Sequence, residues 1–342
     1  MSDENNEYPF VSVIVPVRNE EKNIENCLKA LSKLDYPKDR YEIIVSDGCS
    51  TDGTQEIARR YGARVLHNEG RSRATGVNVG VEHSSGDYIA FTDADCVVDR
   101  SWLLNSLNYF EDDEVAGVGG PNIVPPTVSP FTRAIEYVTL QTPGAIKFEK
   151  KETVRSLAGC NSIYRAKLLK TFFPLPQIGY VEDTLLNYRI RKAGFKLVSA
   201  PDAIVWHNRH YTNYEQFFKQ IFLYGKGEAQ AKRIHREMYS AARILEIFSL
   251  PIALTFAVAL YFINRPTFLA IISLGVLLLL SLSVKCILET KSLAVALHVP
   301  MVTITEALGY SIGYIQESIS PTKESKSDEG KISCSEGKAK HK

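Results

Sequence analysis

Two carboxylates, one residue apart, directly follow an apolar stretch in the first third of the chain. The segment "DYIAFTDADC" (87–96) places Asp93 and Asp95 where a short buried strand would end. Carboxylate oxygens suit Mg²⁺ or Mn²⁺, ions that proteins usually share with the phosphates of a substrate. Because D-x-D triplets also occur in ordinary polar loops, the surrounding elements must decide whether this one is a site.

More acidic residues follow other expected strands of the same region. Asp47 and Asp52 come after a strand at 41–48, and Glu20 follows a strand at 11–16. Further strands are expected at 63–67 and 87–92, with helices between them, and this alternation predicts an α/β fold with a mainly parallel sheet and helices on both faces. In such sheets ligands bind beyond the carboxyl ends of the strands, so all these acids would lie on one rim.

Carboxylates gathered on one rim repel each other unless a cation or a hydrogen-bonding ligand joins them. The pattern therefore indicates a metal-bridged diphosphate, with Asp47 available for a base or ribose. A helix starting near Ser72 could add backbone N–H groups, and Arg71 or Arg73 could add positive charge. We also expect Asn19 to cap the first helix.

Six segments in order resemble a family-2 inverting glycosyltransferase of the GT-A fold, over roughly residues 10 to 230. They read "VSVIVPVRNEEKNI", "YEIIVSDGCSTDGT", "GRSRATGVNVG", "GDYIAFTDADC", "AGCNSIYRAK" and "GYVEDTLLNYRIRKAGFKL". The resemblance implies that a UDP- or GDP-sugar binds with Mg²⁺ or Mn²⁺. It implies donor contacts at Pro16, Glu20, Asp47 and Asp52, and a D-x-D pair that reaches the ribose and the metal.

The resemblance also assigns residues in the second half of this region. Asp183 would be the general base, with Glu182 beside it at the acceptor, and His207 would be a further metal ligand. Gly159, Asn161 and Arg165 would line the sugar and acceptor pocket. Each has a plainer alternative: the acidic pair could only begin a helix, His207 could be a partly buried histidine after a strand, and 156–169 could be an ordinary strand-to-helix connection.

Composition excludes some classes of partner. Forty Lys and Arg balance thirty-nine Asp and Glu, so no global field attracts nucleic acid. Cysteines at 27, 49, 96, 160, 286 and 334 form no C-x-x-C pair, which argues against zinc and against a disulfide framework. The polar, acidic N-terminus shows no cleaved signal peptide, and a reducing, cytosol-facing location fits best.

Beyond residue 243 the sequence becomes almost continuously apolar. Membrane helices are expected at 244–263 and 266–284, and a third segment, 292–315, could span or lie in the interface. The alternative is a buried helical hairpin in a soluble protein. Basic residues flank the pair, which predicts a multi-pass cell-membrane protein with a cytoplasmic catalytic domain. The expected parts are an extension (1–9), a catalytic domain (10–232) with an interfacial helix near 215–232, a membrane domain (233–317) and a disordered tail (318–342).

The acceptor has no clear signature. Processive relatives carry a Q-x-x-R-W motif, whereas the nearest stretch here, "QIFLYGKG" (220–227), lacks the arginine and tryptophan. Single additions to a hydroxyl of a membrane-associated acceptor, a lipid-linked glycan or a glycolipid, are therefore expected. Alternatives are a polyprenyl-phosphate glycosyltransferase, a nucleotidyltransferase and a non-catalytic membrane scaffold. The sequence indicates neither the sugar nor the oligomeric state.

Overall fold

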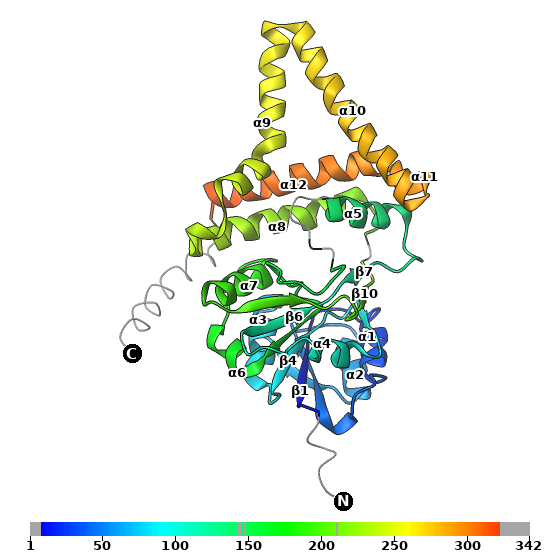
Figure 1. The fold of residues 1–342 in the computed structure, drawn as a ribbon, viewed down its shortest axis with the longest axis vertical. Helices are drawn as coiled ribbons and strands as arrows, with labels where there is room; N and C mark the ends of the chain where they lie inside the picture. The colour runs from blue at the N-terminus through cyan, green and yellow to red at the C-terminus, as the bar shows by residue number, and fades with distance from the viewer. Residues whose placement is uncertain (1–7, 142–145, 147, 210, 322–342) are drawn as a thin grey trace, which may run out of the picture. The chain divides into compact units, whose positions relative to one another are not determined.

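The computed structural model describes residues 8–141, 146, 148–209 and 211–321 (Figure 1). Most of the expected N-terminal extension and of the expected tail lies outside these ranges. The described residues divide into two compact units, one from Met1–Pro125 and Ile146–Asn208, the other from Pro126–Ala145 and Arg209–Lys342. We describe each unit separately.

A seven-stranded sheet forms the centre of the first unit, in the order β3-β2-β1-β4-β8-β6-β9. Only β8 runs antiparallel to its neighbours β4 and β6; the remaining pairs are parallel. The expected α/β class with a mainly parallel sheet is thus confirmed. The strands are β1 (Val11–Val17), β2 (Tyr41–Asp47), β3 (Arg64–His67), β4 (Tyr88–Phe91), β6 (Val115–Gly119), β8 (Ser162–Arg165) and β9 (Lys196–Ser199).

Helices cover both faces of this sheet because its central strands are apolar on both sides. Val13 and Val15 of β1 pack with Leu28 of α1 on one face, whereas Ile14 packs with Val77 of α3 on the other. A strand buried on both faces reads as a continuous apolar run, as "VSVIV" does. The α-helices of the unit are α1 (Ile24–Leu31), α2 (Thr54–Arg60), α3 (Arg73–His83), α4 (Trp102–Leu107), α6 (Ala166–Leu169) and α7 (Glu182–Lys192), and η2 (Lys38–Arg40) and η3 (Lys170–Phe172) are short 3₁₀ turns.

A small second sheet lies beyond the carboxyl end of β4. It has the order β5-β10-β7, with β5 (Cys96–Val98), β10 (Val205–His207) and β7 (Asn122–Ile123). β10 runs antiparallel to β5, and the register sets His207 opposite Cys96. This pairing brings a residue from the end of the unit next to the D-x-D segment.

The expected helix cap at Asn19 is wrong. Helix α1 begins only at Ile24, and its N-terminal neighbour Asn23 makes no side-chain cap. Asn19 instead has a positive φ of 56° and its Oδ1 accepts a hydrogen bond from the Thr51 N–H at 2.9 Å. Asparagine tolerates this left-handed conformation, so here it joins two loops of the rim rather than starting a helix.

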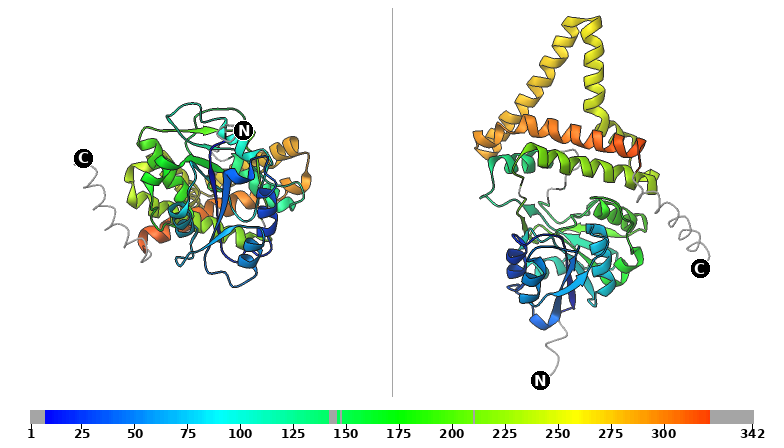
Figure 2. Two further views of the ribbon diagram at one scale, coloured as in Figure 1. Left: turned by 90° about the horizontal axis from the view of Figure 1, so that it is seen from below. Right: turned by 180° about the vertical axis from the view of Figure 1, so that it is seen from behind.

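The second unit is helical, and all of its described elements are labelled in Figure 1 except a 3₁₀ turn, η4 (Arg236–Met238). Within it α9 and α10 form a hairpin, and α12 runs along α8, as the view from behind in Figure 2 also shows. The α-helices are α5 (Pro130–Gln141), α8 (Tyr214–Ile234), α9 (Ala241–Ile263), α10 (Arg265–Thr290), α11 (Leu293–Ala296) and α12 (Val299–Ile319). The helix expected near 215–232 is therefore α8, and its contacts place it with these helices.

Glycines allow α8 and α12 to approach each other closely. A Cβ added to Gly225 would lie 2.1 Å from the Tyr310 carbonyl oxygen, and one added to Gly313 would lie 2.0 Å from that of Phe222. Small residues at helix crossings are common where helices associate in membranes.

Two helices of the described chain are long and apolar enough to cross a membrane, Arg265–Thr290 and Leu293–Ile319. The apolar part of α9, Ile247–Ile263, is shorter. On α10 the most apolar stretch is not buried inside the protein, and Leu277 and Leu278 are each more than 60% exposed.

Candidate active site

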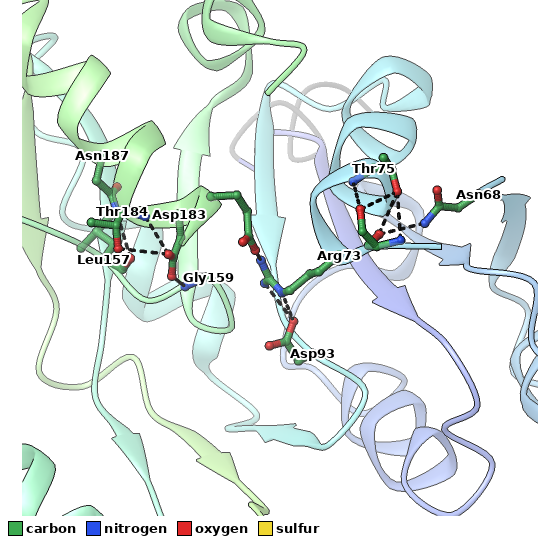
Figure 3. A network of polar contacts seen from close by, with 11 residues as sticks. Asn68, Arg73, Thr75, Asp93, Leu157, Gly159, Asp183, Thr184 and Asn187 are labelled. Atoms are coloured by element: carbon green, nitrogen blue, oxygen red, sulfur yellow. Dashed lines mark hydrogen bonds and ion pairs between the residues drawn. The ribbon is translucent and has the colours of Figure 1, made fainter. Parts of the chain in front are cut away.

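Arg73 joins two acidic residues beyond the carboxyl end of β4 (Figure 3). Its Nε and Nη2 donate to Asp93 Oδ1 at 3.0 and 2.9 Å, and its Nη1 donates to Glu182 Oε1. Arg73 opens α3, whose first turn is fixed by a capping box between Ser72 and Thr75. The arginine is thus held in place by a well-capped helix while it bridges two other segments of the chain.

Glu182 is almost fully buried, with 3% of its surface exposed. Burial raises the pKa of Glu182 and the neighbouring Asp183 adds to the rise, while the Arg73 guanidinium opposes both. The arginine therefore stabilises a carboxylate that would otherwise be costly to keep ionised.

Asp183 lies beside this group and accepts backbone hydrogen bonds on both oxygens. Its Oδ2 accepts from the Gly159 N–H at 2.9 Å and its Oδ1 from the Thr184 N–H at 2.6 Å. A Cβ added to Gly159 would lie 2.7 Å from Arg73 Nη2, so a side chain here would require the guanidinium or the loop to shift. Gly159 thereby brings Asp183 and Arg73 into one site.

Asp95 faces His207. His207 Nε2 lies 3.1 Å from Asp95 Oδ2, and the Asn208 N–H donates to the Asp95 carbonyl oxygen at 2.9 Å. Burial alone would lower the pKa of His207, but the Cys160 thiolate and the Asp95 carboxylate outweigh it and raise that pKa to about 10. A carboxylate oxygen and an imidazole nitrogen are also ligand atoms that fit a divalent cation.

The acids near β1 and β2 complete the same rim. Burial raises the pKa of Glu20, a hydrogen bond from Asn23 opposes the rise, and the charges of Asp95, Asp93 and Asp52 add to it. Asp52 accepts from the N–H groups of Thr54 and Glu21 at 3.1 and 3.2 Å. These groups repel each other, as acids meant for a cation or a polar ligand would.

Asp47 ends β2 and is 1% exposed. Its Oδ2 accepts from Ser50 N–H at 3.0 Å and from Gln55 Nε2 at 2.7 Å. Its Oδ1 is buried with no hydrogen-bond partner among the described residues. Such an oxygen retains the capacity to accept one more hydrogen bond.

Two further predicted residues lie beside this rim. Pro16 lies opposite Ser46 in the β1–β2 pair, next to Val17 and Asp47 at the end of both strands. Arg71 is exposed and has a positive φ of 55°. It ends a turn that is closed by the hydrogen bond from its N–H to the Asn68 carbonyl oxygen.

The structure does not bring Arg165 to this rim. β8 is antiparallel to β4, so Arg165 pairs with Tyr88 at the opposite end of the strand from Asp93. Its guanidinium donates to the carbonyl oxygens of Val115 and Phe110. These contacts tie β8 to β6 and to the segment before β6. The sequence predicted parallel strands before β8 and did not indicate that β8 runs the other way.

Asn161 lies nearer but is fully buried and its amide is used internally. Its Oδ1 accepts from Trp102 Nε1 at 2.8 Å, and its Nδ2 donates to the carbonyl oxygens of Ala203 and Pro121. These bonds fix the loop that carries Gly159. Asn161 therefore supports the loop of the site, and its side chain is not exposed to a ligand.

Sequence reasoning missed two cysteines at the site. Cys160 Sγ lies 3.6 Å from His207 Nδ1, and Cys96 belongs to the same buried cluster. No spacing pattern in the sequence indicates this cluster, because its three members come from segments far apart in the chain.

Comparisons with known proteins identify the family of the chain. Residues 12–173 match the model of the family described as Glycosyl transferase family 2. Glycosyltransferase AglE of Haloferax volcanii is 31% identical over 238 residues, which cover 67% of this chain and 76% of that protein. The chain belongs to glycosyl transferase family 2.

A second relative and one solved structure are also similar to this glycosyltransferase. It is the dolichyl N-acetyl-alpha-D-glucosaminyl phosphate 3-beta-D-2,3-diacetamido-2,3-dideoxy-beta-D-glucuronosyltransferase of Methanococcus voltae, 29% identical, with 63% of this chain and 72% of that protein covered. Among solved structures, the mannosyltransferase PcManGT of Pyrobaculum calidifontis, in complex with GDP-Man and Mn²⁺, matches with a TM-score of 0.68 at 21% identity. The match covers 92% of this chain and 88% of that one, and the expected GT-A fold is confirmed. As a family 2 member, the enzyme transfers a sugar from a nucleotide-sugar donor.

Proposed function

We propose that this enzyme is a metal-dependent inverting glycosyltransferase that adds single sugars to a hydroxyl of a membrane-associated acceptor. The observation that carries the proposal is the group formed by Asp93, Arg73, Glu182 and Asp183 beyond the carboxyl end of β4. It combines acids for a cation, a fixed guanidinium and a carboxylate held by backbone N–H groups. Transfer of a sugar from a diphosphate with inversion needs charge neutralisation at the departing diphosphate and a base for the proton of the attacking hydroxyl, and these groups supply both.

The donor binds along the ends of β1, β2 and β4. The buried Asp47 Oδ1 has a free acceptor position that a base or ribose donor group would satisfy, and Pro16, Glu20 and Asp52 lie beside it. Arg73, and the exposed Arg71 just before α3, supply positive charge for the diphosphate.

The cation would be Mg²⁺ or Mn²⁺, held by Asp95, Asp93 and His207. The fit rests on the facing Asp95 and His207 donors, 3.1 Å apart. When bound, the ion neutralises the charge that develops on the departing diphosphate. The solved structure of PcManGT contains Mn²⁺.

Asp183 would take the proton from the attacking hydroxyl. The N–H groups of Gly159 and Thr184 hold its carboxylate in a fixed orientation, so the group needs no rearrangement when the acceptor arrives. Glu182, already bound to Arg73, would position the arginine rather than accept the proton. Because an external oxygen displaces the diphosphate directly, no sugar becomes attached to the protein.

A membrane location supports an acceptor on a lipid. A soluble protein buries its apolar helices. Here Phe262 and Ile263 at the end of α9 are about 80% exposed, and many leucines of α10 are also exposed, although less so. We infer a multi-pass protein of the cell membrane, with its catalytic domain (10–232) cytoplasmic and residues 233–317 as the membrane domain. A lipid-linked glycan or a glycolipid is the acceptor class.

The test is a donor screen on detergent-purified protein. UDP- and GDP-sugars are supplied with Mn²⁺ or Mg²⁺, and nucleoside diphosphate release is measured for the wild type and for Asp93→Ala/Asp95→Ala. We expect metal-dependent release from one donor and its loss in the double variant. Turnover that survives chelation of the metal and the double substitution would refute the metal-dependent mechanism.

The second candidate function is transfer to a polyprenyl phosphate, whose phosphate is already ionised and needs no strong base. The proposed hydroxyl acceptor predicts that Asp183→Asn lowers the transfer rate by about 10²–10⁴-fold, because a general base is removed. An Asp183→Asn variant with near wild-type rates would favour the polyprenyl-phosphate acceptor. Glu152→Gln, a change at an exposed acid whose carboxylate pairs with Lys150, is the control.

A further inference from the structure

Two cysteine thiols and one histidine ring lie close together next to the D-x-D segment. Cys96 Sγ, Cys160 Sγ and one ring nitrogen of His207 all lie within 4.8 Å of one another. They come from β5, from the loop before β8 and from β10, and both cysteines are buried, with 0% and 5% exposed surface. Three soft donors from three separate segments are the ligand set of a zinc site.

The distances within this cluster suit a tetrahedral ion. With Zn–S near 2.3 Å and Zn–N near 2.0 Å, sulfur and nitrogen ligands lie about 3.5 Å apart in tetrahedral geometry. Cys160 Sγ and His207 Nδ1 are 3.6 Å apart. Thiolates select zinc over Mg²⁺ and Mn²⁺, which prefer oxygen.

The other side of the His207 ring supplies a support typical of zinc sites. With Nδ1 turned to the sulfur atoms, Nε2 faces Asp95 Oδ2 at 3.1 Å. Histidines that bind zinc usually donate their second N–H to a carboxylate, which fixes the ring and its tautomer. Asp95 is placed to accept that bond.

We propose that Cys96, Cys160 and His207 form a site for Zn²⁺, and that its occupation competes with the catalytic cation. Any protons on the two sulfur atoms and on His207 Nδ1 pass to solvent when the ion binds, and the fourth position is left to water. His207 then carries its proton on Nε2 and donates it to Asp95, so neither group is free to hold Mg²⁺ or Mn²⁺. The competition, unlike the zinc site itself, rests on the proposed function.

Cobalt spectroscopy tests the site without any assay of activity. Co²⁺ is added to the detergent-purified full-length chain in a non-thiol reductant, and the thiolate-to-cobalt charge-transfer band is recorded. We expect the wild type to show this band and Zn²⁺ to abolish it by displacing the cobalt. The band should be much weaker in Cys96→Ser and in Cys160→Ser. Cys49→Ser is the matched control, because Cys49 lies 3.8 Å from His67 Nε2 but belongs to no such cluster in the part of the chain that the structure describes.

Thermal unfolding guards against misfolded variants. Zn²⁺ should raise the melting temperature of the wild type and of Cys49→Ser, because a ligand that binds only the folded state stabilises it. It should leave the melting temperatures of Cys96→Ser and Cys160→Ser unchanged. Absence of the cobalt band from the wild type, or its full retention in both cluster variants, would overturn the site.

Competition is measured as nucleoside diphosphate release at fixed Mn²⁺ with rising Zn²⁺. We expect Zn²⁺ to inhibit, more Mn²⁺ to restore the rate, and Cys160→Ser to need at least about tenfold more Zn²⁺, as loss of one ligand weakens binding. Equal inhibition of the wild type and Cys160→Ser would overturn the competition. If no donor turns over under any condition, the proposed function fails, while the cobalt spectrum still decides the zinc site.

Discussion

Arg73 shows how one side chain can organise a site made of mutually repelling acids. Burial alone would lower its pKa, but Asp93, Glu182 and Asp183 raise that pKa well above the ordinary value. The guanidinium thus remains charged while it holds carboxylates from two distant segments. The guanidinium lies directly against Gly159, where an added Cβ would approach it to 2.7 Å.

Gly159→Ala tests this fit. The new methyl group would lie 2.7 Å from Arg73 Nη2, so the guanidinium or the loop that holds Asp183 must move. A displacement of about 1 Å at reacting groups can lower a rate by about 10²-fold. We expect a loss of that order in kcat, measured by nucleoside diphosphate release.

The control for this prediction is Gly275→Ala in α10, where an added Cβ meets no atom within 4 Å. It should have wild-type rates. If Gly159→Ala also kept the wild-type rate, the close approach of Arg73 to Gly159 would have no role in catalysis.

At the scale of elements, Glu42 connects the amino ends of the central strands, far along the sheet from the catalytic rim. Its Oε1 accepts from Ser12 Oγ at 2.7 Å, and from Ser85 Oγ and N–H at 2.7 and 3.0 Å. Burial raises its pKa, but these hydrogen bonds and Arg64 outweigh that and give a net lowering. Glu42 therefore loses its proton more readily in the folded protein than in the unfolded chain.

The sign of the pH dependence follows from this lowering. Glu42 contributes stability above its ordinary pKa of 4.5, and the contribution is lost as the pH falls through the lower pKa of the folded state. We expect Glu42→Gln to have a lower melting temperature than the wild type at neutral pH, with the difference closing as the pH falls below 4.5. Thermal unfolding across this range measures it.

Glu56→Gln is the control for Glu42, because Glu56 forms only an exposed pair with Arg60 at 3.9 Å. Exposed pairs of this kind add little stability, so its melting temperature should follow the wild type at every pH. A gap for Glu42→Gln that stayed constant with pH would contradict the assignment to its ionisation.

At the scale of the whole molecule, the chain combines a GT-A unit with a helical unit that has exposed apolar helices. In the helical unit the α9–α10 hairpin turns at Asn264, whose Oδ1 accepts from the Thr267 N–H and caps α10. If the hairpin crosses the membrane, this turn lies on the side opposite the catalytic unit.

Site-directed labelling tests this topology. In intact cells a membrane-impermeant maleimide should label Asn264→Cys above the wild-type level. It should not label Glu82→Cys, an exposed position on α3, until the cells are permeabilised. The opposite labelling pattern would place the catalytic unit outside.

The sequence alone determined the α/β class, the acidic rim and the apolar helices, because these depend on local patterns. Apolar runs predict buried strands, and acids at strand ends must share a rim when strands are parallel. The pairing of β4 with β8 could not be read this way, so the position of Arg165 opposite Tyr88 was not foreseen.

Only the tertiary structure decided which distant side chains meet. Arg73 and Glu182 are separated by 109 residues, and Asp95 and His207 by 112, yet each pair is in contact. Cys96 and Cys160 showed no metal pattern in the sequence because their spacing has no local period, and β10 alone brings His207 between them and Asp95. Such contacts depend on strand order and register, which the packing of the entire sheet selects.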